Sequence, residues 1–141
     1  MPFAATDFHT FALWLIQNRT DEASLRTAIS RVYYAGHLLA VQRLMTRGWE
    51  PKGTGEDHRG VIRELRRGRT RHLADKLTLL LELREHADYH LEAADTGRSP
   101  HCQFCKQVRD SSSPAEPAVT WHHWEEVQEV SQNLLPLLER L

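Results

Sequence analysis

The chain has 141 residues, of which 40% are hydrophobic and 26% charged, and its formal net charge at pH 7 is −1. This length suits one domain, residues 1–141, and the small net charge gives no overall field that would select nucleic acid or a membrane. The first residues lack a secretory leader pattern, and no stretch reaches the roughly 18 apolar residues that span a bilayer. We therefore expect a cytoplasmic protein without a membrane partner.

The pattern of apolar residues predicts an all-α fold, an antiparallel bundle of about five helices. The first helix covers roughly residues 7–18, and a long second helix starts after the N-cap candidates Thr20 and Asp21 and stops at Gly48. Residues 49–57 form a loop, and a short third helix covers about residues 58–66. No stretch alternates between apolar and polar residues in the manner of a strand.

The fourth helix has the most regular pattern. It begins after Thr70, and apolar side chains recur along it at steps of four and three. Arg84 interrupts this stripe, and a buried arginine is costly unless it has a partner. The other positions of the stripe are Leu73, Leu77, Leu80, Ala87 and Leu91.

A long irregular excursion is expected before the last helix. Residues 95–119 contain several serines and prolines, and connections within helical bundles are usually much shorter. Such a segment is expected to be functional, tied to the bundle, or disordered. The last helix covers residues 120–141, and Pro136 should kink it.

Two stretches of the sequence resemble the signatures of a known family. Residues 30–37 read SRVYYAGH, with a tyrosine pair before a histidine, and residues 83–90 read LREHADYH, with an arginine before a histidine. The stretch between them, residues 55–62, reads GEDHRGVI. Together they are similar to the HEPN family of small helical bundles, many of which are ribonucleases or derive from them. His37 comes one position earlier than the histidine of the family's usual pattern.

The resemblance implies a metal-independent endoribonuclease, a toxin or defence effector that needs no cofactor for catalysis. Arg84 would hold the phosphate of RNA, and His90 would transfer protons. The family often builds this site at a homodimer interface, and many members have a nucleotidyltransferase antitoxin that modifies a tyrosine, here Tyr89. Helix geometry also favours a dimer. Six residues put His90 roughly 9 Å along and about 120° around the helix axis from Arg84, so one helix cannot easily bring both side chains to one phosphate. Two copies that face each other across a two-fold axis can do so.

A non-catalytic interpretation of the same residues stays open. Arg84 and Asp88 are four residues apart and can form an ion pair within the helix, while His90 can be a solvated residue at the helix end. Members of the family also serve as binding or assembly modules within larger complexes. The alternative is therefore a catalytically inactive module with another protein as its partner.

An arginine-rich stretch separates the third helix from the fourth. Arginine suits phosphate, so this stretch can guide an RNA backbone towards the site. It can equally be a solvated turn whose charge is balanced by acidic residues elsewhere. The proposed RNA-binding residues are Arg59, Arg63, Arg66 and Arg67.

Two cysteines in the excursion predict a metal site. Cys102 and Cys105 have the Cys-x-x-Cys spacing that directs two thiolates at one zinc ion, and His122 can complete the set. His101 is a further candidate ligand. Two free thiols or a reversible disulfide are the alternatives. His86 and His90 also have the spacing of a metal pair on a helix, which we interpret as a coincidence because no third ligand is evident nearby.

Overall fold

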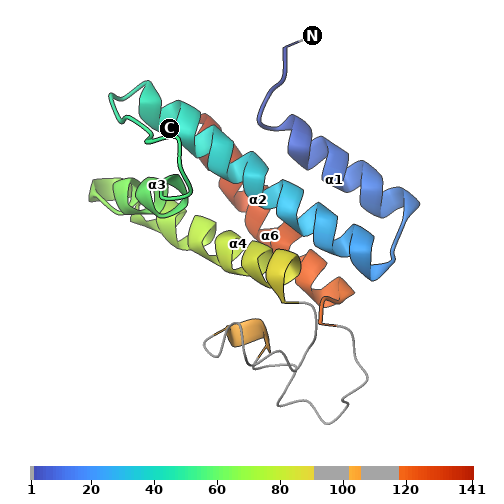
Figure 1. Ribbon diagram of the computed structural model, residues 1–141. Helices are drawn as coiled ribbons and strands as arrows, with labels where there is room; N and C mark the ends of the chain where they lie inside the picture. The colour runs from blue at the N-terminus through green and yellow to red at the C-terminus, as the bar shows by residue number, and fades with distance from the viewer. Residues whose placement is uncertain (1, 91–101, 106–117) are drawn as a thin grey trace.

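The predicted all-helical class is confirmed by a computed structural model, which describes residues 2–90, 102–105 and 118–141. No strand occurs in these ranges. Figure 1 shows the helices running side by side as an elongated bundle. They are α1 (Asp7–Asn18), α2 (Glu22–Met45), α3 (Asp57–Leu65), the short 3₁₀ helix η1 (Gly68–Thr70), α4 (Arg71–Tyr89) and α6 (Trp121–Glu139).

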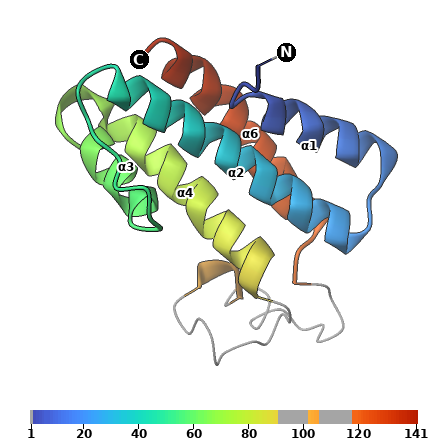
Figure 2. The same cartoon turned by 45° about the horizontal axis from the view of Figure 1, so that its top comes forward.

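The long helix α2 is the centre of the bundle and contacts α1, α3, α4 and α6 (Figure 2). Its start follows the sequence prediction, because the Asp21 carboxylate accepts a hydrogen bond from the backbone N–H of Ser24 at 3.2 Å. The helix ends at Met45, before the predicted stop at Gly48. Gly48 has a φ of 93°, a left-handed conformation that glycine adopts without strain, and so turns the chain away.

The apolar stripe of α4 forms part of the core. Leu77 is fully buried, and Arg84 occupies its position in the stripe with a side chain that is only 12% exposed. Leu91, the last predicted member of the stripe, lies outside the described residues. Thr70 precedes the helix as predicted but does not cap it with its side chain. Its hydroxyl instead donates a hydrogen bond to the carbonyl of Leu65 at 2.5 Å, which closes the turn after α3.

The last helix, α6, starts with a reciprocal cap. The backbone N–H of Thr120 donates a hydrogen bond to Nδ1 of His123 at 2.9 Å, and the Thr120 side chain accepts one from the backbone of His123. Pro136 lies inside this helix.

Of the predicted excursion, residues 95–119, only 102–105 and 118–119 are described, and 103–105 form a short helical turn. This turn lies at the end of the bundle where α4 finishes and α6 begins (Figures 1 and 2). None of the described helices is long and apolar enough to cross a membrane.

Candidate metal centre

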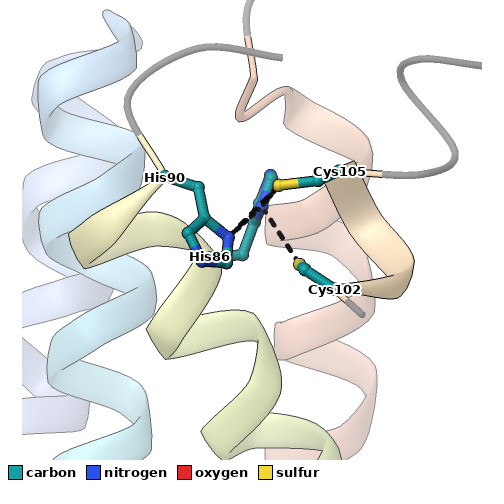
Figure 3. Close-up of side chains that lie close together, drawn as sticks. All are labelled: His86, His90, Cys102 and Cys105. Carbon is teal, nitrogen blue, oxygen red and sulfur yellow. Dashed lines mark hydrogen bonds between the residues drawn. The ribbon is translucent and has the colours of Figure 1, made fainter. Parts of the chain in front are cut away.

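Two histidines and two cysteines converge at the C-terminal end of α4. His86 and His90 come from the last turn of α4, and Cys102 and Cys105 from the short helical turn (Figure 3). The four potential ligand atoms all lie within 4.8 Å of one another. Cys105 Sγ is 3.3 Å from Nδ1 of His86 and 3.2 Å from Nδ1 of His90, and the two Nδ1 atoms are 3.2 Å apart. Cys102 Sγ is 3.6 Å from Nδ1 of His86.

Four of the six separations are close to the edges of a zinc tetrahedron, and the other two lie within 4.8 Å. Zinc lies about 2.0–2.1 Å from nitrogen and about 2.3 Å from sulfur, so ideal angles place two nitrogens roughly 3.3 Å apart and nitrogen and sulfur roughly 3.6 Å apart. The measured distances of 3.2 Å between the nitrogens and 3.2–3.6 Å between nitrogen and sulfur agree with this geometry. The arrangement is therefore compatible with one structural metal ion.

The ring of His86 is fixed from its far side. Its Nε2 lies 2.6 Å from the carbonyl oxygen of Ala118, which can only accept a hydrogen bond, so Nε2 carries the proton. The lone pair of Nδ1 then faces the centre, as a metal ligand requires. Burial lowers the pKa of His86, although the Ala118 carbonyl opposes this shift, so the ring is neutral at pH 7.

A clamp from α2 holds the end of α4. The Arg26 guanidinium donates hydrogen bonds to the carbonyls of Ala87 at 2.7 Å and His90 at 2.8 Å, at the C-terminal end of α4. Arg26 also pairs with Glu22 at 2.9 Å. The same Glu22 oxygen accepts a hydrogen bond from the backbone N–H of Val119 at 3.4 Å, so this clamp reaches the chain next to Ala118 as well.

The short helical turn that carries the cysteines packs against the bundle through Phe104. This side chain is 2% exposed, and its ring centroid lies 5.7 Å from those of both His86 and His123. Gln103 donates a hydrogen bond to Glu82 on the neighbouring face of α4 at 2.5 Å. Cys102 and Cys105 are three residues apart, so one helical turn puts both thiols on the side that faces the histidines.

The predicted ligand His122 is not part of this cluster. Its side chain is 93% exposed, and its Nδ1 lies 4.0 Å from Glu125 of the same helix. Its neighbour His123 is buried, but its Nδ1 is used by the cap of α6, and burial lowers its pKa to about 4. His101 lies outside the described residues.

His86 and His90, whose spacing we interpreted from the sequence as a coincidence, lie beside the cysteines where His122 was expected. His86 and His90 stand one helical turn apart, and Cys102 and Cys105 also stand one turn apart, so each pair is a local signal. Nothing local joins the two pairs, because residues 91–101 separate them. The spacing within each pair is that of two metal ligands, so each pair could be predicted as half of a four-ligand site.

The second candidate site, Arg84, has different surroundings from His90. Arg84 Nε lies 2.8 Å from Oδ2 of Asp88, an ion pair without hydrogen-bond geometry. The other end of its guanidinium donates hydrogen bonds to the hydroxyls of Tyr34 at 3.0 Å and Tyr89 at 3.1 Å. Tyr89 itself is 50% exposed. Within one chain, Arg84 is therefore bound to Asp88 and two tyrosines, while the His90 ring joins the cysteines.

The predicted RNA-binding arginines lie partly around one hollow. A hollow of about 720 Å³ between α3, α4 and the loop before α3 is lined by Arg59, Arg63, Arg67 and Arg84, together with His58. Arg59 lies 3.7 Å from Glu85, and Arg67 lies 3.3 Å from Glu64. Arg66 faces elsewhere and pairs with Asp75 at 2.7 Å. Acidic partners thus offset much of the basic charge of this stretch.

No family model, curated protein or solved structure matches the chain. The likeness to the HEPN family therefore rests on the sequence motifs described above.

Proposed function

We propose that this chain is a helical module of HEPN type whose fold is stabilised by a structural zinc ion. In this proposal it binds a partner protein and does not cleave RNA. The observation that carries this proposal is the convergence of His86, His90, Cys102 and Cys105 at the separations of a zinc tetrahedron. Nitrogen and thiolate ligands suit zinc, and four protein ligands leave no open position for a substrate. Such a site stabilises a fold and gives the metal no role in RNA cleavage.

The chemistry of the centre bears directly on His90. A ring nitrogen that is bound to zinc cannot accept and release protons at working pH. His90 is also buried, with only 6% of the residue exposed. Arg84 is engaged by Asp88 and two tyrosine hydroxyls. These contacts favour a binding role over cleavage by the Arg84–His90 pair.

A second candidate is the ribonuclease implied by the resemblance. The observation that favours it is the position of Arg84 at the hollow that Arg59, Arg63 and Arg67 also line. An RNA phosphate that entered this hollow would meet these four guanidinium groups, together with carboxylates that include Glu64 and Glu85. The homodimer with α4 in its interface, the nucleotidyltransferase antitoxin and a role in defence belong to this candidate.

Elemental analysis of protein that was purified without any chelator tests the zinc proposal. The expected result is one zinc ion per chain. If the protein contains no metal and both cysteine thiols react with a thiol reagent, the zinc proposal is wrong. A pair of ligand exchanges separates the two candidates. His90→Cys and His86→Cys should both keep a four-ligand zinc site, but only His90→Cys removes the imidazole of the Arg–His motif.

The assay follows a labelled single-stranded RNA with zinc-loaded proteins and no chelator. The binding-module proposal expects the wild type and both variants to leave the RNA intact. Cleavage by the wild type and by His86→Cys, lost in His90→Cys at full zinc occupancy, would instead establish the ribonuclease.

A further inference from the structure

A second, smaller hollow opens onto the metal centre. It has a volume of about 300 Å³, and its lining includes His90, Cys102 and Phe104 from the centre and its surroundings. The opposite side is formed by α4, including Glu82 and Glu85. One side of the cluster is thus reachable by a small solute, although the cluster is otherwise buried.

The two cysteines differ in their access to this hollow. Cys105 has no exposed surface and touches both histidine rings, with sulfur–nitrogen distances of 3.2 and 3.3 Å. Cys102 is half-buried, lines the hollow, and lies farther from His86, at 3.6 Å. A reagent that enters the hollow therefore meets the sulfur of Cys102 first.

The thiolate form of both sulfurs would come from the zinc ion of the proposed centre. The Nδ1 atom of His86 presents its lone pair towards both sulfurs, because Nε2 holds the proton on the Ala118 carbonyl, so the imidazole and the two sulfurs face one point where a cation would lie. A bound zinc ion would deprotonate both thiols outright. The thiolate is the form of cysteine that attacks peroxides, and accessible thiolates beside a second cysteine are the ones most readily oxidised.

We propose that Cys102 is a peroxide-reactive thiol and that Cys105 is its resolving partner. This inference rests on the proposed zinc site, because oxidation of the two cysteines would release the zinc ion. The co-reactant is hydrogen peroxide or a small alkyl hydroperoxide. The Cys102 thiolate attacks the peroxide oxygen, the O–O bond breaks, and a sulfenic acid and hydroxide (or alkoxide) form. The Cys105 thiolate then attacks the Cys102 sulfur and expels a second hydroxide.

The two steps reduce one peroxide and oxidise two thiolates to one disulfide. Two protons from water neutralise the two anions that are released, so atoms and electrons balance. The geometry allows the second step, because the two sulfurs lie within 4.8 Å of each other on one helical turn. They need to approach to about 2 Å for the disulfide to form. The disulfide removes two of four ligands, so zinc should leave with it.

The hollow should also select among oxidants. Glu82 and Glu85 stand in its lining, and its volume of about 300 Å³ leaves little room beside the sulfur. Neutral, small peroxides should therefore react faster than anionic or bulky reagents, such as an aromatic disulfide with carboxylate groups. This preference reverses the order expected for a thiol on an open surface.

The test exposes the zinc-loaded full chain to hydrogen peroxide and follows two readouts. A chromogenic chelator reports released zinc, and intact mass reports the loss of two hydrogens. We expect both to advance together and to be reversed by a dithiol with added zinc. In Cys105→Ser a sulfenic acid should accumulate at Cys102 and be trapped by a dione probe. The matched Cys102→Ser variant should label at least roughly tenfold more slowly.

Substoichiometric alkylation of the wild type keeps the test decisive if a serine variant fails to fold. Cys102 should be labelled before Cys105 in peptide maps. Equal labelling of the two cysteines, or thiols that stay reduced while zinc remains bound, would overturn the proposal. Metal analysis of the untreated protein is a separate readout. A chain without zinc would contradict the proposed centre, while the mass change would still decide the thiol chemistry.

Discussion

Arg26 donates a hydrogen bond from its guanidinium to the backbone carbonyl of His90 at 2.8 Å, across 64 positions of sequence. The contact joins the first turns of α2 to the last residue of the histidine pair. Since the same guanidinium also bonds the carbonyl of Ala87 at 2.7 Å, α2 fixes where α4 ends. The candidate metal centre is therefore supported by a helix that contributes none of its four potential ligands.

Replacing Arg26 by alanine should weaken both the fold and the metal site. A hydrogen bond to a charged group contributes about 1.5–3 kcal/mol, and the freed carbonyls at the end of α4 would lose their partner. We expect a lower melting temperature and weaker zinc binding in competition with a chelator. Arg26→Lys should recover part of the affinity. The exposed pair of Arg19 with Asp21 provides the control, since Arg19→Ala should change neither quantity by much. Unchanged zinc affinity in Arg26→Ala would contradict the clamp.

The identity of the ligands can be checked by three single substitutions. His86→Ala and Cys105→Ala should each abolish stoichiometric zinc binding, because three remaining ligands hold zinc far more weakly at a structural site. His122→Ala should bind one zinc per chain, as its side chain is 93% exposed and faces Glu125. Metal content after gel filtration gives the answer. Loss of zinc in His122→Ala would restore the ligand set that the sequence alone suggested.

Removing Asp88 from its ion pair with Arg84 should lower the unfolding free energy more than removing Arg84. Asp88→Ala leaves a guanidinium that is 12% exposed without its counter-charge, although the carboxylate itself is 25% exposed. We expect a loss of about 1–3 kcal/mol of unfolding free energy, below the range for fully buried pairs. Arg84→Leu should cost less, because leucine continues the apolar stripe of α4. Urea denaturation measures both. A larger loss for Arg84→Leu than for Asp88→Ala would show that the tyrosine contacts dominate.

Acid should destabilise the zinc-free protein partly through His37. Burial, with the neighbouring His58 adding to it, lowers the pKa of His37 to about 4. The unfolded chain then binds a proton near the ordinary value of 6.5 while the native state does not. Unfolding free energy should fall as the pH drops from about 6.5 towards about 4, and this contribution is present in full above that window. His37→Gln should flatten the dependence, and His72→Gln, at an exposed position, should leave it unchanged. Equal slopes for wild type and His37→Gln would contradict the assignment.

The sequence predicted those features whose signals are local. Asp21 caps α2 as expected, and the bounds of α1 match the predicted residues, because cap and periodicity act within a few positions. Thr70 was expected to cap α4 but bonds to Leu65 instead, since a hydroxyl at a tight turn has several carbonyls within reach.

The four residues of the candidate metal centre could be predicted only as two separate pairs. The spacing of Cys102 and Cys105 predicts half of a metal site, but the ligand predicted to complete it, His122, lies away from the cluster. The true neighbours of the cysteines are the histidines before them, and that proximity depends on how the chain packs. The bond from His86 to Ala118 and the clamp by Arg26 are likewise contacts between distant segments, which spacing alone does not reveal.

The candidate centre takes its four potential ligands from two pairs, each with a fixed local spacing, so its geometry does not depend on the number of residues between the pairs. Cys105 and His90 are 15 positions apart, and the entropic cost of bringing the ends of such a loop together rises only slowly with its length. Each doubling of a loop adds only about 0.6 kcal/mol to the entropic cost of closing it. Insertions between residues 91 and 101 should therefore be tolerated thermodynamically, whereas a single insertion between His86 and His90 would rotate one ring out of the site. Descendants or designed variants of this chain can thus diverge in loop length while both ligand pairs keep their internal spacing.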